Sequence, residues 1–222
     1  MTTADGDDLE LLLDRLSTLA AASVGDRRRV LGVAGPPGAG KTTLVLRVLA
    51  AAAGDGRLAG RVAHVPMDGF HLPGPELRRL GRETRKGAPD TFDTSAYAAT
   101  LQAARDLPRR RLLAPSFDHA VGEPEPEAIE VPAESDLVVT EGNYLLLDDP
   151  AWLPVRRQLD EVWFCALADD VRRGRLVARH VDAGRPARDA AAWVARSDEA
   201  NARLVASTAG AAHLVLVDGR VV

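Results

Sequence analysis

The segment from Gly35 to Thr42 has the residue types and spacing of a phosphate-binding loop. It reads Gly-Pro-Pro-Gly-Ala-Gly-Lys-Thr and matches the pattern G-x-x-x-x-G-K-S/T at every specified position. In such a loop, glycines let backbone N–H groups surround phosphate oxygens, the lysine bridges the outer phosphates, and the threonine hydroxyl ligates magnesium. We expect a nucleoside triphosphate to be bound by Gly35, Pro36, Pro37, Gly38, Ala39, Gly40, Lys41, Thr42 and Thr43, with Thr42 also a ligand of Mg²⁺.

Two acidic residues follow apolar runs that are typical of buried strands. Asp68 comes after Val65–Met67, and Glu141 comes after Leu137–Thr140. Because the carboxyl ends of parallel strands meet at one edge of a sheet, both acids are expected near the phosphate-binding loop. Asp68 could accept the proton of a substrate hydroxyl, or it could cap a turn before a glycine. Glu141 could hold Mg²⁺, or it could be a surface residue at the end of its strand.

The remaining motifs favour a kinase over other proteins that bind nucleoside triphosphates. The base-reading motif N/T-K-x-D of guanine-specific switches is absent, as is the signature of transporter ATPases. Only Lys41 and Lys86 are lysines among 28 basic residues, so a chemical reason is sought for each. Lys86 could bind an anionic acceptor or a phosphate, or it could be an exposed lysine in a basic loop.

Five motifs, taken in order, resemble those of the phosphoribulokinase/uridine kinase superfamily of P-loop kinases. They are Gly35 to Thr42, Pro66 to His71, Arg85 to Asp93, Pro115 to His119 and Thr140 to Tyr144. The resemblance covers roughly residues 28 to 217. Within the superfamily, the chain is most similar to bacterial nucleoside/nucleotide kinases that include fructose-transport-system kinases, and pantothenate kinase and uridine kinase are more distant.

This resemblance implies a role for several residues in a reaction that uses ATP and Mg²⁺. Asp68 matches the catalytic aspartate, Glu141 matches the magnesium-associated acid, and Lys41 belongs to the catalytic set. Arg175 and Arg179 lie where these kinases place arginines of a lid, with Arg175 binding ATP and Arg179 catalytic; either could equally be an ordinary helix arginine. The residues implied to bind the acceptor are Asp68, His71, Lys86, Phe117, Asp118, His119 and Glu141.

The acceptor segment departs from uridine kinase. Gly87 stands where that family has an aspartate that holds ribose, whereas Lys86-Gly87-Ala88-Pro89 resembles pantothenate kinase. We therefore expect transfer of the γ-phosphoryl group of ATP to a hydroxyl of a sugar or polyol-like metabolite. A nucleoside or pantothenate-type kinase is one alternative, and a P-loop ATPase or regulatory switch is another.

The elements that must position these residues alternate between strands and helices. Strands are expected over 30–34, 61–66, 137–140, 161–167 and 213–217, and helices over 9–19, 41–53, 93–107, 170–183 and 186–207. The segments 67–92 and 114–134 are rich in Pro and Gly or Glu and are expected to be connections. The pattern predicts an α/β fold of three layers, α/β/α, with a five-stranded, mainly parallel sheet. We expect one P-loop kinase domain over 1–222, with a leading helix in 1–25 and a helical lid at about 169–186.

The composition of the chain disfavours several other classes of protein. The 222 residues carry a formal charge of −4, which disfavours a nucleic-acid partner, and no apolar run is long enough for a membrane span. The single cysteine, Cys165, excludes an internal disulfide, and the acidic N-terminus does not resemble an export signal. We expect a cytoplasmic protein whose partner is a small-molecule acceptor, without membrane contact; formation of a homodimer is left open.

Overall fold

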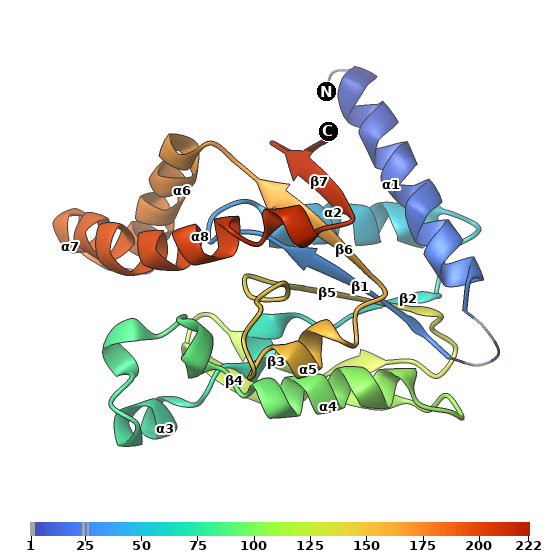
Figure 1. Cartoon of the computed structure of the whole chain (residues 1–222), viewed down its shortest axis with the longest axis horizontal. Coiled ribbons are helices and arrows are strands. Elements are labelled where there is room, and N and C mark those ends of the chain that lie inside the picture. Colours follow the sequence, from blue (N-terminus) through green and yellow to red (C-terminus); the bar gives the residue numbers. More distant parts are fainter. Residues whose placement is uncertain (1–2, 24, 26) are drawn as a thin grey trace.

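The computed structural model describes residues 3–23, 25 and 27–222 and centres on one six-stranded sheet (Figure 1). The strands are β1 (Arg29–Ala34), β2 (Val62–His64), β5 (Leu137–Gly142), β6 (Glu161–Ala166), β7 (Leu214–Val217) and β8 (Arg220–Val221), in the order β2-β5-β1-β6-β7-β8. The first five pair in parallel, as predicted. The sixth, β8, pairs antiparallel with β7 and was not predicted, because two residues are too few to give an apolar pattern.

Both faces of the sheet are buried under helices. Because successive side chains of a strand point to opposite sides, each strand contributes to the cores on both faces. In β1, Val30 and Ala34 face one hydrophobic core, whereas Leu31 and Val33 face the other. Helices α1 (Thr3–Ala21) and α2 (Lys41–Gly54) cover one face, and α4 (Thr94–Arg105) and α5 (Leu153–Arg156) cover the other (Figure 1). The predicted three-layer α/β/α fold is confirmed.

Four helical segments lie beyond the carboxyl ends of β1 and β6, where a lid was expected (Figure 1). They are α6 (Asp169–Asp182), α7 (Ala187–Trp193), the π-helical turn η4 (Val194–Asp198) and α8 (Glu199–Ala206). Gly184, with φ of 89°, ends α6 near the predicted break. The single helix predicted for residues 186–207 is instead interrupted by the π turn.

Residues 112–131 form a β-hairpin where an irregular connection was predicted. Strand β3 (Leu112–Asp118) pairs antiparallel with β4 (Glu123–Val131), with a shift of register between Ala114 and Ser116. Four glutamates and two prolines in β4 hide the strand pattern, because charged residues and proline are rare in the interior of a sheet. The hairpin is a separate two-stranded sheet, where such residues are tolerated.

The glycine- and proline-rich segment after β2 contains only short helices, as its composition suggested. They are η1 (Met67–Phe70), α3 (Gly74–Arg79), η2 (Glu83–Arg85) and η3 (Pro89–Thr91), and a last short turn, η5 (Ala209–Ala211), precedes β7. Asp93 caps α4 as predicted, since its Oδ1 accepts a hydrogen bond from Ala96 N at 2.8 Å. Across the described ranges, every helix is too short or too polar to cross a membrane.

Candidate functional site

The phosphate-binding loop connects β1 to α2, and its glycines are required by close contacts. A Cβ on Gly35 would lie 2.4 Å from the carbonyl oxygen of Cys165, and one on Gly38 would lie 2.9 Å from Leu176 Cγ. Gly40 precedes α2 with φ of 88°, a conformation that side chains other than glycine rarely adopt. The loop is therefore shaped as a cradle of backbone around the first turn of α2, which suits phosphate oxygens.

Lys41 is buried at the start of α2 and is held in place by two oxygens. Its Nζ donates to Asn143 Oδ1 at 2.7 Å and to the carbonyl oxygen of Pro36 at 3.1 Å. Burial lowers the pKa of Lys41, while the carboxylates of Glu141 and Asp68 raise it. A lysine ammonium has three donors, so one remains for a phosphate oxygen.

Glu141 and Thr42 form the second link between the phosphate-binding loop and β5. Thr42 Oγ1 donates to Glu141 Oε1 at 3.1 Å, and Glu141 is only 6% exposed. Burial, and after it the nearby charge of Asp68, raise the pKa of Glu141, whereas Lys41 and the hydrogen bond from Thr42 lower it; the net result is a pKa of about 7. A hydroxyl and a carboxylate oxygen are the ligands that Mg²⁺ takes beside phosphate groups and water. No cluster of three or more His, Cys, Asp or Glu side chains in the described residues competes with this pair for a metal.

The raised pKa of Glu141 gives a pH-dependent stability. Because folding favours the protonated carboxyl, its contribution to stability is fully present below its ordinary pKa near 4.5 and is lost as pH rises through about 7. We expect the melting temperature of the ligand-free protein to fall roughly 5–10 °C more between about pH 5 and pH 8 than that of Glu141→Gln. Mg²⁺ should reverse the loss above pH 7 in the wild type only. Equal pH profiles of the two proteins, measured by scanning calorimetry, would contradict this assignment.

Asp68 is brought to the same edge of the sheet by two glycines that allow close packing. A Cβ on Gly69 would lie 2.2 Å from the carbonyl oxygen of Pro115, and one on Gly142 would lie 2.5 Å from Met67 Sδ. The turn η1 is therefore wedged between β3 and β5. Asp68 is close enough to raise the pKa of both Glu141 and Lys41.

The carboxylate of Asp68 does not cap its own turn. His71 N and Nδ1 bond to the main-chain oxygen of Asp68, at 3.2 and 2.8 Å. Within the described residues the Asp68 carboxylate makes no hydrogen bond and no ion pair. It is thus available to a hydroxyl group, which is the first of the two roles considered from the sequence.

A cavity of about 450 Å³ lies between the loop and helix α6. Its lining includes Lys41 and Thr42 at one end, Arg175 and Arg179 of α6, and the β7–β8 turn at Asp218. Both arginines that the resemblance placed in a lid therefore face the phosphate-binding loop. Arg185, which follows α6, instead stacks its guanidinium 4.3 Å from the centre of the Trp193 ring.

Asn143 and Arg172 were not predicted to belong to the site. Asn143 holds Lys41, and Arg172 donates from α6 to the carbonyl oxygen of Pro37 at 3.4 Å. Arg172 is 1% exposed and also pairs with Glu199 of α8, so it joins the loop to both α6 and α8. Nothing in the sequence separates Arg172 from the many other arginines. Asn143 lies two residues after Glu141, a position that could have identified it.

Four of the remaining acceptor candidates cluster around Phe117, next to the turn that holds Asp68, and one does not. The ring centre of Phe117 lies 4.7 Å from that of His71 and 5.2 Å from that of His119. Lys86 Nζ lies 5.2 Å from the same Phe117 ring centre. Asp118 instead stabilises the hairpin turn, where its Oδ1 accepts hydrogen bonds from Ala120 N at 2.7 Å and Val121 N at 3.2 Å.

Comparison with known proteins establishes the family. No family model matches the sequence. A Schizosaccharomyces pombe protein named for a uridine kinase is 34% identical over 177 residues, which are 77% of this chain and 74% of that protein. The chain belongs to the uridine kinase-like P-loop kinases. The superfamily resemblance found in the sequence is thereby confirmed.

Two further matches place this P-loop kinase among its relatives. A crystal structure from Silicibacter sp. TM1040, named for a fructose transport system kinase, superposes with a TM-score of 0.75 and 31% identity, over 88% of this chain and 94% of that one. A pantothenate kinase from Nocardioides sp. is 34% identical over 120 residues, which are 53% of this chain and 35% of that protein.

The bond between Asn143 and Lys41 gives this P-loop kinase a testable positioning residue. Replacing Asn143 by Ala removes a hydrogen bond to a charged group, so we expect kcat/KM for ATP to fall about 10- to 100-fold. Asn143→Gln, which keeps the amide oxygen, should recover part of the loss. Steady-state kinetics with ATP varied would test this, and an alanine variant as active as the wild type would remove Asn143 from the site.

Proposed function

We propose that the protein transfers the γ-phosphoryl group of ATP to a hydroxyl of a small metabolite of the sugar or polyol kind, with Mg²⁺. One observation carries the proposal. The carboxylate of Asp68, which has no partner among the residues that the structure describes, lies at the same edge of the sheet as Lys41, Thr42 and Glu141. A group that could activate a hydroxyl therefore adjoins groups that could hold a triphosphate.

Each residue then has a defined task. Lys41 and the backbone N–H groups of residues 38–42 hold the β- and γ-phosphates, and Thr42 and Glu141 hold the metal. When bound, Mg²⁺ neutralises charge on the phosphate oxygens. Asp68 orients the acceptor hydroxyl and takes its proton as the new O–P bond forms and the bond from the γ-phosphorus to the β-bridging oxygen breaks. The bridging oxygen stays on the β-phosphate of ADP and carries the negative charge when ADP leaves. The proton passes from Asp68 to solvent.

Arg175 and Arg179 complete the site from the lid. Their guanidinium groups carry positive charge into the cavity beside the loop, where charge accumulates on the transferring phosphoryl group. Exclusion of water by the lid would favour transfer to an alcohol over hydrolysis of ATP.

A nucleoside or pantothenate-type kinase is the second candidate. The match to pantothenate kinase and the Lys86–Pro89 motif support the pantothenate type. A nucleoside acceptor is disfavoured, because Gly87 offers no side chain to ribose and its carbonyl oxygen already accepts a hydrogen bond from Tyr144. The name of the Silicibacter relative favours a sugar.

Release of ADP tests the proposal directly. Purified protein with ATP and Mg²⁺ is given sugars, polyols, nucleosides or pantothenate in turn. Release of ADP that depends on one acceptor, with phosphorylated product seen by mass spectrometry, is expected. Hydrolysis of ATP at the same rate with and without every acceptor would instead support an ATPase or switch.

A further inference from the structure

Lys86 resembles Lys41 in lacking a carboxylate partner. Among the residues that the structure describes, neither lysine has an acidic oxygen within 4.0 Å. For Lys41 the missing counter-ion is a phosphate of the nucleotide. Lys86 is only partly exposed, and within the described part of the chain its ammonium group has one hydrogen-bond acceptor, the neutral carbonyl oxygen of Gly122 in the hairpin turn. Two of its three donors remain for another group.

The acids near Lys86 are engaged elsewhere. The two carboxylate oxygens of Glu123 share the N–H of Gly74, at 3.0 and 3.1 Å, and Asp118 accepts from backbone N–H groups of its own turn. Asp90 pairs with Arg82 and Arg85, which precede Lys86 in the same segment. None of these acids forms an ion pair with Lys86 within the described residues, so its ammonium group has no direct carboxylate partner.

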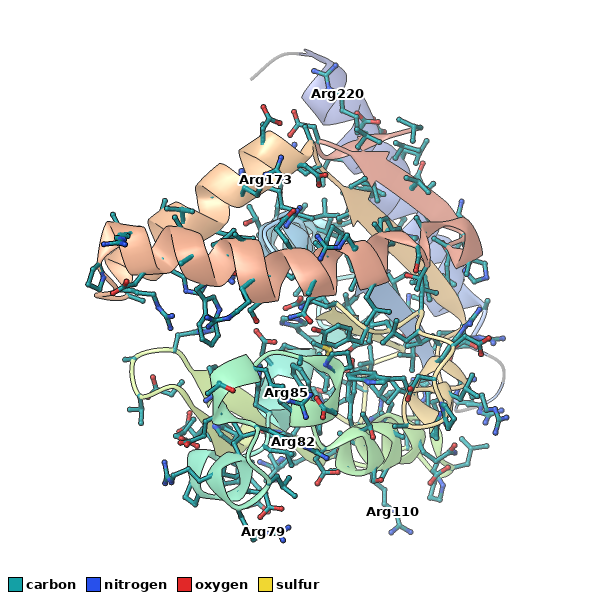
Figure 2. All side chains as sticks on the ribbon, turned by 60° about the vertical axis from the view of Figure 1, so that its left-hand side comes forward. Arg79, Arg82, Arg85, Arg110, Arg173 and Arg220 are labelled. Carbon is teal, nitrogen blue, oxygen red and sulfur yellow. The ribbon has the colours of Figure 1, made fainter. Side chains whose placement is uncertain are left out.

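The other basic residues of this segment cannot replace Lys86. Figure 2 shows Arg79 projecting from the lower surface of the molecule, on the side away from the α6–α8 helices. Arg82 and Arg85 share the single carboxylate of Asp90, and Arg79 pairs with Glu76. Lys86 alone among these four lies against the aromatic cluster beside Asp68.

The rings of His71 and Phe117 lie between the main chain of the proposed catalytic acid, Asp68, and Lys86. The Nδ1 atom of His71 contacts the main-chain oxygen of Asp68. Because a carbonyl oxygen can only accept, Nδ1 carries the proton and donates this hydrogen bond. Burial lowers the pKa of His71, so the ring is neutral near pH 7 and its Nε2 is a hydrogen-bond acceptor. Phe117 packs next to His71, and Lys86 lies over Phe117.

We propose that the acceptor is an anionic polyol, whose carboxylate or phosphate binds Lys86 while its hydroxyl faces Asp68. The assignment rests on the proposed kinase function and narrows its substrate class. A further hydroxyl of the acceptor donates to His71 Nε2, and the C–H face of its carbon chain packs on Phe117. A neutral sugar would leave the Lys86 ammonium without a counter-ion, which disfavours its binding.

Matched acceptors test this class. We compare glycerol, glycerate and glycerol phosphate, and likewise ribose, ribonate and ribose 5-phosphate, by the rate of ADP release. The charged members should have kcat/KM at least about 10-fold above the neutral ones, as expected for a charge-assisted hydrogen bond. Preference for the acid or for the phosphate identifies the anionic group. Preference for neutral members overturns the inference and leaves the kinase function standing.

Lys86→Gln is the decisive variant. It should abolish the preference for charged acceptors, and Lys86→Arg should restore part of it, whereas the exposed Arg79→Gln should keep the wild-type preference. A preference unchanged in Lys86→Gln would overturn the inference. If no acceptor supports ADP release, the proposed function fails, and the anion site is then judged by thermal shift with glycerate and ribose 5-phosphate. Stabilisation of the wild type but not of Lys86→Gln would support the site, and no difference would reject it.

Discussion

Replacing Asp68 by Asn should lower kcat about 10²–10⁴-fold, because it removes the group that accepts the hydroxyl proton and keeps the size of the side chain. The affinity for ATP should change little, since no hydrogen bond joins the Asp68 carboxylate to the phosphate-binding loop. The two parts of this expectation are measured separately, turnover by ADP release and affinity by titration calorimetry with a non-hydrolysable ATP analogue.

A second readout distinguishes loss of a base from general damage. The charge of Asp68 contributes to the raised pKa of Glu141, so Asp68→Asn should lower that pKa and move the associated loss of melting temperature to lower pH. Asp148→Asn, a matched change at an exposed residue, should leave turnover and the pH profile of melting as in the wild type. Turnover by Asp68→Asn within a few-fold of the wild type would exclude Asp68 as the base.

The layers of the fold could be predicted because buried strands have a strong local pattern. Runs such as Val30–Ala34 and Leu137–Thr140 are apolar on both faces, which is typical of parallel strands under helices. The hairpin at 112–131 could not be predicted in this way. Only Ala114 and Val131 are fully buried in it, so its strands carry almost no alternation of apolar and polar residues.

Residues of the candidate site could be predicted where they directly follow a strand. Residues that reach the site through a long-range contact could not be predicted. Asp68 and Glu141 were placed by the rule that carboxyl ends of parallel strands meet at one edge. Arg172 reaches the loop from 135 residues away, and a helix that contains several arginines gives no sign of which one turns inward. Its position depends on how α6 packs, which is a property of the whole fold.

At Gly69 and Gly142, the local sequence pattern suggests the wrong reason for the presence of a glycine. An Asp-Gly pair reads as a turn, in which the aspartate caps its own backbone. In the structure the glycine is needed because another segment passes within contact distance: Pro115 for Gly69 and Met67 for Gly142. The glycines therefore report close packing of η1 against β3 and β5, and this packing leaves the Asp68 carboxylate free.

Replacing Lys41 by Ala should lower kcat/KM for ATP about 10²–10³-fold, comparable with the loss of one donor that stabilises a transition state. Both nucleotide affinity and turnover should fall, because Lys41 would contact the phosphates before and during transfer. The fold should persist, since the variant removes a buried charge together with its desolvation cost. Melting temperature, ATP-analogue binding and ADP release measure the three effects.

Lys41→Ala should also change the pKa of Glu141, an effect that loss of a phosphate contact alone would not produce. Lys41 lowers the pKa of Glu141, so its removal should raise that pKa above 7 and require a higher pH for Mg²⁺ to bind. Arg110→Ala, which removes a positive charge from the exposed surface seen in Figure 2, should change neither quantity. If Lys41→Ala bound the ATP analogue as tightly as Arg110→Ala, the cradle of backbone at Gly35–Thr42 would not be the nucleotide site, and the assignment of the loop would fail with it.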